Sequence, residues 1–223
     1  MPGAASEQKT HLKLTGGQRV YLWFKRGIDI LLSGVGLIVL SPVFLGMIVA
    51  IKLEDGWRAP VFFSQKRVGI HKRYFQLYKF RSMKLDTPHD MPTHLLHNPE
   101  QYITKVGKVL RRTSLDELPQ IWNILKGDMS VIGPRPALWN QEDLLEERDK
   151  YGANDVPPGL TGWAQINGRD ELEINVKARF DGEYVKKLSL LFDVKCFFGT
   201  IFRVLRSDGV VEGGTGAKEN NKQ

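Results

Sequence analysis

The longest apolar stretch of the chain runs from Ile30 to Ile51 and contains no formally charged side chain. Its length is about that of a helix crossing a bilayer core of roughly 30 Å. The pair Ser41-Pro42 lies near its middle. Proline removes a backbone donor and clashes with the preceding turn, so a helix breaks or kinks there. The stretch is too long for a cleaved signal peptide, which leaves a kinked span or a helix-break-helix hairpin.

The charges that flank this stretch bear on its topology. Lys25 and Arg26 precede it, and Lys52 and Arg58 follow it. The positive-inside bias therefore pulls both ends toward the cytoplasm. Asp29, near the start, would be costly deep in hydrocarbon. A hairpin that enters and leaves on the cytoplasmic side satisfies these observations, but the residues alone leave the kinked span open.

Shorter patterns follow the apolar stretch. Alternation of side chains predicts strands at 61–63 and 74–80. Helical periodicity then dominates over four ranges: 103–112, 115–126, 138–150 and 172–206. The part of the last range after Tyr184 mixes aromatic and aliphatic residues with Lys and Arg, which is typical of a helix lying on a membrane surface and also of one packing on a core.

Positive charge is concentrated in two acid-free segments of this 223-residue chain, whose net charge is +7. Eight Lys or Arg lie between Gly56 and Leu85, and a second cluster comprises Lys105, Lys108, Arg111 and Arg112. Such clusters indicate phosphate-bearing partners, which are nucleic acid, anionic lipids or nucleotides. The single cysteine, Cys196, excludes an internal disulfide and any metal site built on several cysteines.

The stretch from Arg111 to Pro136 holds the most informative chemistry: RRTSLDELPQIWNILKGDMSVIGPRP. Ser114 to Glu117 fits a capping box, in which Ser114 caps a helix and Glu117 reaches back to its amide. Pro119 favours a later helix start. In both readings Asp116 and Glu117 lie at a helix N-terminus, which stabilises their charged forms by roughly 0.3–1 kcal/mol.

Capping alone is a sufficient explanation for two such carboxylates, but their neighbours suggest more. Arg111, Arg112 and Arg135 have no structural need so close to Asp116 and Glu117. Arginine forks match phosphate oxygens, and a magnesium ion prefers one or two carboxylates plus substrate phosphates. A diphosphate substrate with a divalent cation would use all of these groups.

Several segments together resemble the bacterial sugar transferase family, the monotopic polyprenyl-phosphate phosphoglycosyl transferases, in its short form without extra N-terminal spans. The matching segments are KRGIDILLSGVGLIVLSP (25–42), PVFFSQKRVG (60–69), YKFRSM (78–83), TSLDELPQIWNILKGDMSVIGPRP (113–136) and PGLTGWAQINGR (158–169). The Asp-Glu segment and the Gly-Pro-Arg-Pro turn are highly specific in combination. They move the interpretation of Asp116 and Glu117 from capping toward catalysis.

The resemblance implies a two-step reaction. Asp116 would attack the diphosphate of a UDP-sugar and release UMP, and polyprenyl phosphate would then take the phospho-sugar from the carboxylate. Glu117 carries over as a Mg²⁺ ligand. Arg111 and Arg135 are the expected phosphate binders, with Lys79 and Arg81 as further candidates. Gln65, Asp128, Gln165 and Arg169 also fall in matching segments, but a structural role suffices for them.

The resemblance also implies the fold. We expect an α+β protein, mostly helical with a small β element, an N-terminal re-entrant membrane helix broken at Ser41 and Pro42, and amphipathic interfacial helices. The expected organisation is a flexible tail (1–18), the membrane hairpin (19–54), a catalytic domain on the membrane surface (55–206) and a second tail (207–223). The expected location is the cytoplasmic face of the bacterial inner membrane, in contact with its lipids. The insert at 82–102 matches no interpretable motif.

Two other functions compete with the transferase. Basic clusters beside aromatic residues such as Tyr74 and Tyr78 are typical of a nucleic-acid binder, but Asp116, Glu117 and Asp128 would repel a nucleic-acid backbone. We therefore expect no nucleic-acid partner. A non-catalytic scaffold of glycan assembly would have no use for an intact Asp-Glu pair.

Overall fold

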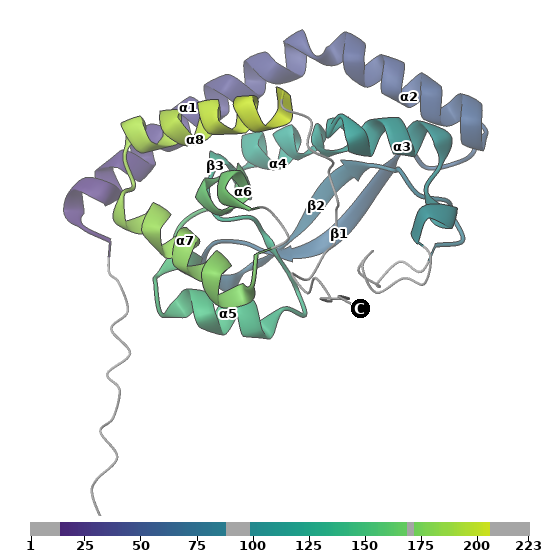
Figure 1. The fold of residues 1–223 in the computed structure, drawn as a ribbon. Coiled ribbons are helices and arrows are strands. Elements are labelled where there is room, and N and C mark those ends of the chain that lie inside the picture. Colours follow the sequence, from purple (N-terminus) through teal and green to yellow (C-terminus); the bar gives the residue numbers. More distant parts are fainter. Residues whose placement is uncertain (1–13, 88–98, 169–171, 206–223) are drawn as a thin grey trace, which may run out of the picture.

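The computed structural model describes residues 14–87, 99–168 and 172–205 (Figure 1). These residues form a mostly helical α+β fold in which two short sheets are surrounded by helices. The fold class expected from the sequence is confirmed to that extent. The tails beyond these bounds and most of the 82–102 insert lie outside the described residues.

The apolar stretch forms two helices, α1 (Gly16–Val39) and α2 (Ser41–Asp55), that meet at Leu40 with a bend of 58°. Pro42 lies in the first turn of α2, where its missing N–H costs no helical bond. Among the described residues no single helix is long and apolar enough to cross a membrane, and the bent pair of α1 and α2 meets that criterion only when its two helices are taken together, by length and composition. Thr15 and Gln18 form a capping box at the start of α1, so the helix begins earlier than the expected boundary at residue 19.

The larger sheet is antiparallel. Its central strand β1 (Phe62–Val68) pairs with β2 (Tyr74–Phe80) on one side, with Gln65 opposite Leu77, and with β4 (Ala137–Leu138) on the other. The strand expected at 74–80 is confirmed. The strand expected at 61–63 starts one residue later and ends five residues later, because the residues that follow Phe63 pair with β2. A second, parallel pair joins β3 (Ser130–Ile132) to β5 (Gly159–Thr161), which no sequence pattern predicted.

Helices fill the rest of the chain: α3 (Lys105–Arg112), α4 (Gln120–Lys126), α5 (Glu142–Asp149), α6 (Trp163–Asn167), α7 (Ile174–Lys186) and α8 (Leu190–Leu205), with 3₁₀ turns η1 (Ile70–Lys72), η3 (Pro99–Tyr102), η4 (Leu115–Glu117) and η5 (Ala153–Asp155). Three expected helices are shorter than predicted. The 115–126 helix is divided ahead of Pro119, and the 138–150 helix loses its start to β4. The 172–206 helix is interrupted at Ser189, whose hydroxyl accepts from the amide of Phe192 in the first turn of α8.

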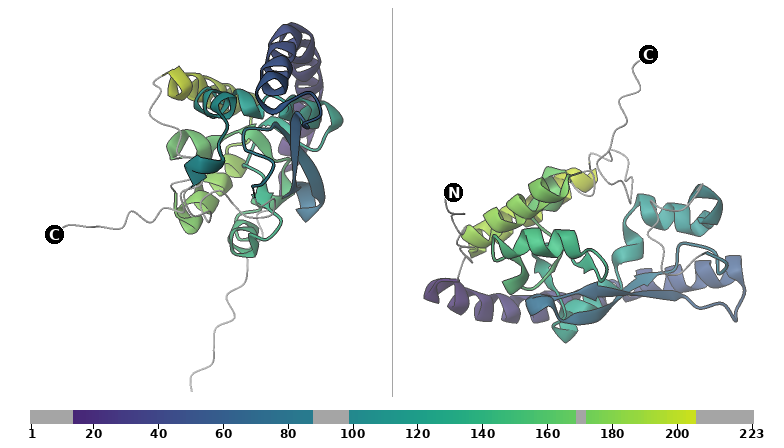
Figure 2. Two further views of the ribbon diagram at one scale, coloured as in Figure 1. Left: turned by 90° about the vertical axis from the view of Figure 1, so that its right-hand side faces the viewer. Right: turned by 90° about the horizontal axis from the view of Figure 1, so that it is seen from below.

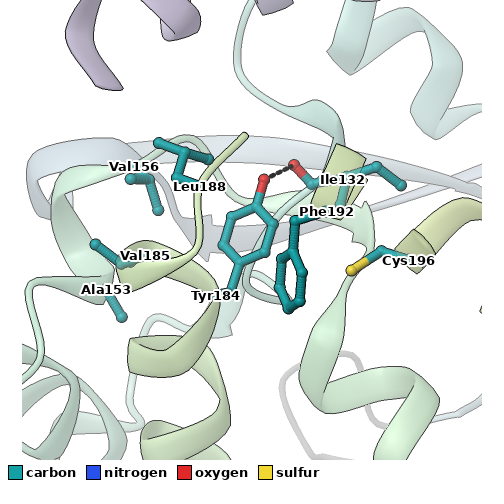
Figure 3. Packing of buried hydrophobic residues seen from close by; sticks show 8 residues of the cluster. All are labelled: Ile132, Ala153, Val156, Tyr184, Val185, Leu188, Phe192 and Cys196. Atoms are coloured by element: carbon teal, nitrogen blue, oxygen red, sulfur yellow. Dashed lines mark hydrogen bonds between the residues drawn. The ribbon is translucent and has the colours of Figure 1, made fainter. Parts of the chain in front are cut away.

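The main core cluster lies between α7, α8 and the strand β3 (Figure 3). Tyr184, Val185 and Cys196 are almost fully buried there. The Tyr184 hydroxyl donates to the carbonyl of Ile132 at 3.2 Å, so the smaller sheet is tied to α7. The thiol of Cys196 is buried, and burial raises its pKa to about 12, which makes this cysteine an unreactive part of the core.

The first half of α1 is docked on this domain by buried polar groups. The ammonium of Lys25 pairs with Asp193 of α8. Arg26 donates to the carbonyls of Ile124 and Leu125 at 2.6 and 2.7 Å, which caps the C-terminal end of α4. These two cations, taken from the sequence as topological signals, therefore have protein partners. Asp29 likewise accepts the amide of Val131 at 3.0 Å.

A broad apolar surface stays exposed on one side of the molecule. In Figure 1 and in the left view of Figure 2, the α1–α2 pair lies at the top of the molecule. Helices α3 and α8 lie just beneath it, and α5 lies at the opposite end. Four exposed apolar residues of α8 recur at helical spacing on one face, opposite the buried Phe192 and Cys196: Leu191, Val194, Phe198 and Phe202. Those of α1 and α2 include Leu31, Val35, Ile38, Val39 and Leu45. An exposed apolar area of this extent marks an interaction site.

Candidate active site

Asp116 and Glu117 lie in the 3₁₀ turn η4, immediately ahead of α4. The capping box expected at Ser114 is wrong. Ser114 adopts a left-handed conformation (φ 56°) and its side chain makes no capping bond, because a capping residue needs an extended backbone. The carboxylate of Glu117 turns instead to two cations brought by distant segments. The turn therefore presents its carboxylates to the protein interior.

The cations beside Glu117 are Lys79 and Arg135. The Lys79 Nζ and the Arg135 Nη2 lie 3.0 and 2.8 Å from Glu117 Oε1. Burial alone would raise the pKa of Glu117, but the charges of Arg135 and Lys79 outweigh it and hold that pKa well below its usual value. Glu117 is therefore ionised at neutral pH. Three of the expected site residues thus meet in one cluster.

Asp116 is almost fully buried, with 2% of its surface exposed. Its Oδ2 lies 3.8 Å from the Lys79 Nζ, so the same ammonium faces both carboxylates. A carboxylate screened from water and held beside cations is poorly solvated and well oriented, which are the requirements for a nucleophile. The arrangement also suits an anionic substrate, because the cations are preorganised before it arrives.

The position of Arg135 is set by residues that sequence reasoning missed. The Arg148 guanidinium donates to the Arg135 carbonyl at 3.0 Å and pairs with the fully buried Asp181. Gly133 lies at a close crossing of two chain segments, since a Cβ there would stand 2.4 Å from the Pro157 carbonyl oxygen. No spacing in the sequence connects Arg148 or Asp181 to the turn, because both come from helices formed later in the chain.

The turn η4 shares a core cluster with helix α2. Leu115 and Leu118, on either side of the two carboxylates, pack on the core cluster of Ile51, Val61, Phe80 and Leu110. The same cluster receives three side chains of α2: Phe44, Met47 and Ile48. Side-chain packing therefore fixes the position of the turn that carries Asp116 relative to α2.

Arg81 and Arg111 have partners away from Glu117. Arg81 donates to the Pro60 carbonyl at 2.6 Å and pairs with Asp55 at the end of α2 at 2.8 Å. Its buried side chain favours a structural role over phosphate binding. Arg111, which is half-buried, donates from Nε to the Ser82 hydroxyl at 2.9 Å. Phosphate binding by either residue stays a prediction.

The other residues of the matching segments make local contacts. Gln65 accepts from Arg67, and Asp128 pairs with Lys126 at 2.9 Å. Arg169 lies outside the described residues. Ser41 donates from its hydroxyl to the Ile38 carbonyl at 2.7 Å, across the break between α1 and α2.

The donor set fits a magnesium ion that is held partly by substrate. Among the described residues no group of three or more acidic, histidine or cysteine side chains converges on one point. Asp116 and Glu117 supply the adjacent hard oxygen donors that Mg²⁺ takes alongside phosphate oxygens. Glu117 is the residue that would hold such an ion, which would offset charge on a bound diphosphate.

Comparison with known proteins explains this combination of groups. A family model described as bacterial sugar transferase matches residues 20–207. The chain belongs to the bacterial sugar transferase family. The resemblance drawn from the Asp-Glu segment and the Gly-Pro-Arg-Pro turn is thereby confirmed.

The chain is similar in sequence to several sugar transferases from other bacteria. The chain is 42% identical over 186 residues to the UDP-glucose:undecaprenyl-phosphate glucose-1-phosphate transferase of Escherichia coli, covering 80% of this chain. It is 38% identical over 198 residues to the UDP-N-acetylgalactosamine-undecaprenyl-phosphate N-acetylgalactosaminephosphotransferase of Aeromonas hydrophila, covering 85% of this chain. It is 40% identical over 186 residues to the uncharacterized sugar transferase EpsL of Bacillus subtilis, covering 83% of this chain.

The chain matches these sugar transferases over different shares of their lengths. The alignments span 39% of the Escherichia coli relative and 45% of the Aeromonas relative, but 89% of the Bacillus one. The range matched by the family model, residues 20–207, contains most of α1 together with α2, the turn η4 and α8.

Glu117→Gln is expected to weaken Mg²⁺ binding and to lower the stability of the fold. Loss of the charge leaves Lys79 and Arg135 without their anion, which should lower the free energy of unfolding by about 1–3 kcal/mol at neutral pH. Because the pKa of Glu117 is lowered on folding, its stabilisation is present above the unfolded-state pKa of about 4.3 and is lost as the pH falls below it.

Denaturant melts from pH 7 to pH 3 should therefore show the native protein and Glu117→Gln converging at acid pH. Magnesium titrations of activity should show a higher half-saturating concentration in the variant. An unchanged magnesium dependence would place Glu117 outside the metal site.

Proposed function

We propose that this protein transfers a sugar 1-phosphate from a UDP-sugar to a polyprenyl phosphate, such as undecaprenyl phosphate, in the initiating step of surface glycan assembly. The observation that carries the proposal is the buried Asp116 carboxylate, which lies 3.8 Å from the same Lys79 ammonium that pairs with Glu117, beside the Glu117–Arg135 pair. Two relatives are named as transferases that use undecaprenyl phosphate. A sugar transferase that handles phosphate groups would use the cations that lie beside the two carboxylates.

In the first step an oxygen of Asp116 forms a bond to the sugar-bearing phosphorus of the donor. The bond from that phosphorus to the bridging oxygen of the diphosphate breaks, and UMP leaves with the electron pair. In the second step an oxygen of polyprenyl phosphate attacks the same phosphorus, and the Asp116 carboxylate is released. Dividing the transfer in two lets one site serve a soluble donor and a lipid acceptor in turn.

The cations have separate parts in this scheme. Lys79 lies between the two carboxylates and would follow the charge as it moves from Asp116 to the phosphoryl oxygens. Arg135 would give a planar fork to the diphosphate. Arg111, half exposed at the end of α3, would be a second phosphate contact.

The apolar surface supports a location on the membrane. The α1–α2 pair would enter and leave the cytoplasmic face of the bacterial inner membrane, with the exposed face of α8 lying on the lipid surface. Exposed tryptophans, which favour the interface between lipid and water, lie near both ends of the pair: Trp23 is 82% exposed and Trp57 is 71% exposed. Tryptophans at both ends fit a segment whose two ends lie at a lipid–water interface, as the ends of the proposed hairpin do.

The proposed activity is tested by UMP release. Detergent-extracted protein is incubated with undecaprenyl phosphate, Mg²⁺ and a panel of UDP-sugars, and UMP and the lipid product are measured. Release of UMP with one UDP-sugar, together with a polyprenyl diphosphate sugar, is expected. Release of UDP in place of UMP would contradict transfer of a sugar phosphate.

The hairpin predicts that both ends of the α1–α2 pair lie on one side of the membrane. Cys196→Ala removes the single native thiol and provides a background for Arg19→Cys, at the start of α1, and Glu142→Cys, in α5; both positions are exposed. Both cysteines should resist membrane-impermeant thiol reagents in intact cells and react after permeabilisation. Labelling of Arg19→Cys from outside would refute the hairpin.

A matched variant tests the cause of the bend. Replacing Ser41 with Leu and Pro42 with Ala permits an unbroken helix of spanning length. A fraction of these molecules should then expose Arg19→Cys outside and lose activity, because the packing between α2 and the catalytic turn depends on the bend.

A further inference from the structure

Gln120, the first residue of α4, is buried in an unusual way. Only 1% of its surface is exposed, and its side-chain Nε2 has no hydrogen-bond partner among the described residues. A buried donor without a partner costs about 1–3 kcal/mol. Such groups are rare in folded proteins and call for an explanation, of which an acceptor supplied by a ligand is one.

The backbone places Gln120 on the same side of the turn as Asp116. Leu118 and Pro119, between η4 and α4, both have helical dihedral angles. Residues four apart on helical backbone lie toward one face, although the turn changes from 3₁₀ to α at this point. Asp116 and Gln120 are both buried, and the spacing points their side chains toward neighbouring parts of that face.

Asn123, about one turn after Gln120, shows that this side of α4 faces β2. The Asn123 side chain accepts the Tyr78 amide at 3.0 Å and donates to the Gln76 carbonyl at 2.7 Å, so it is anchored on β2. Lys79, the next residue of that strand, reaches Glu117. Gln120 precedes Asn123 by about one turn, so it lies toward the same side of α4, the side that meets β2.

We propose that Gln120 is a further catalytic residue, whose amide N–H donates a hydrogen bond to a non-bridging oxygen of the phosphoryl group as that group becomes bonded to Asp116. The inference rests on the proposed function and extends it. An amide suits this place because it is neutral. It donates a hydrogen bond without adding charge to a cluster that already holds two carboxylates with Lys79 and Arg135.

The amide can present either end, because its oxygen and nitrogen exchange places when it turns over. An anionic carboxylate next to it favours the N–H end, and so does an incoming phosphoryl oxygen. Asn123 shows the contrast in the same helix. All of its amide contacts are made within the protein, and its role is structural.

The experiment compares Gln120→Met with the native enzyme. Methionine has a similar volume and no donor, so it removes the unmatched polar group. We expect an unchanged or higher free energy of unfolding in denaturant melts. We also expect the rate of phospho-sugar adduct formation, measured by mass spectrometry in a single turnover without acceptor, to fall by about 10²-fold.

Gln141→Met is the matched control. The Gln141 side chain accepts the amide of Leu138 at 2.9 Å, so the same substitution there removes a satisfied bond. Its free energy of unfolding should fall, and its adduct rate should match that of the native enzyme. A stability loss without a rate loss in Gln120→Met would overturn the proposal.

Gln120→Glu adds a test that survives a folding defect. The ionised glutamate has no donor and repels the phosphoryl group, whereas its protonated form regains an O–H donor. The adduct rate relative to the native enzyme should therefore rise as the pH falls, and a flat ratio would count against the proposal. The native enzyme reports separately on the proposed function: no adduct in it overturns both, while a native adduct with an unchanged rate in Gln120→Met overturns the Gln120 proposal alone.

Discussion

Asp116→Asn is expected to abolish transfer while the protein stays folded. The amide matches the carboxylate in shape, but it carries no negative charge and cannot form the bond to phosphorus. Removal of a nucleophile leaves only the contribution of binding and oriented cations, so we expect a loss of at least about 10⁴-fold in turnover. UMP release measured with native enzyme and variant side by side gives the ratio.

Two further measurements make this prediction specific. Intact-protein mass spectrometry without acceptor should show a phospho-sugar adduct on the native enzyme and none on Asp116→Asn. The free energy of unfolding of the variant should be close to the native value, because Lys79 keeps its pair with Glu117 and the substitution keeps the volume of the buried side chain. Full activity in Asp116→Asn would eliminate the covalent role.

Arg148→Met is expected to have the largest effect on stability. Arg148 and Asp181 form an ion pair with only 4% and 1% of their side chains exposed. Removing one partner leaves an uncompensated buried charge, which costs about 3–5 kcal/mol. The variant also frees the Arg135 carbonyl, so Arg135 should meet Glu117 less well and activity should fall in the molecules that remain folded.

The dependence on pH separates this cause from a general packing defect. Burial raises the pKa of Asp181 even with Arg148 present, and loss of Arg148 raises it further. An acid with a raised folded pKa destabilises the fold as the pH rises above its unfolded pKa. The deficit of Arg148→Met should therefore shrink toward acid pH, and denaturant melts between pH 4 and pH 7 measure it. The double variant Arg148→Met with Asp181→Leu should recover part of the loss, whereas a packing defect predicts a pH-independent deficit.

The sequence predicted the local elements well where a strong local signal exists. Pro42 locates the break between α1 and α2 within two residues, and side-chain alternation gives the bounds of β2. The cluster of Glu117, Arg135 and Lys79 was found because residue types with phosphate chemistry occur in recognisable segments. Asp116 was singled out by the same motif.

Features that depend on distant parts of the chain could not be predicted in this way. Ser114 matches a capping pattern, but its backbone is left-handed where the chain turns from α3 into η4, which the local pattern does not reveal. Arg81 lies in a matching segment, yet its partner Asp55 is known only once α2 is placed beside β2. The parallel pairing of β3 and β5 joins two three-residue strands, too short for periodicity to indicate.

The docking of α1 also has a consequence for how the protein is made. Lys25 and Asp29 find their partners at Asp193 and Val131, which lie 168 and 102 residues later in the chain. During synthesis α1 leaves the ribosome long before those partners exist, and domains fold as their residues become available. In the proposed membrane location both charged side chains would stay in water at the lipid surface until then. The nascent chain would thus be held at shallow depth on the side where it is made, so that the order of translation itself would favour the proposed hairpin over a span.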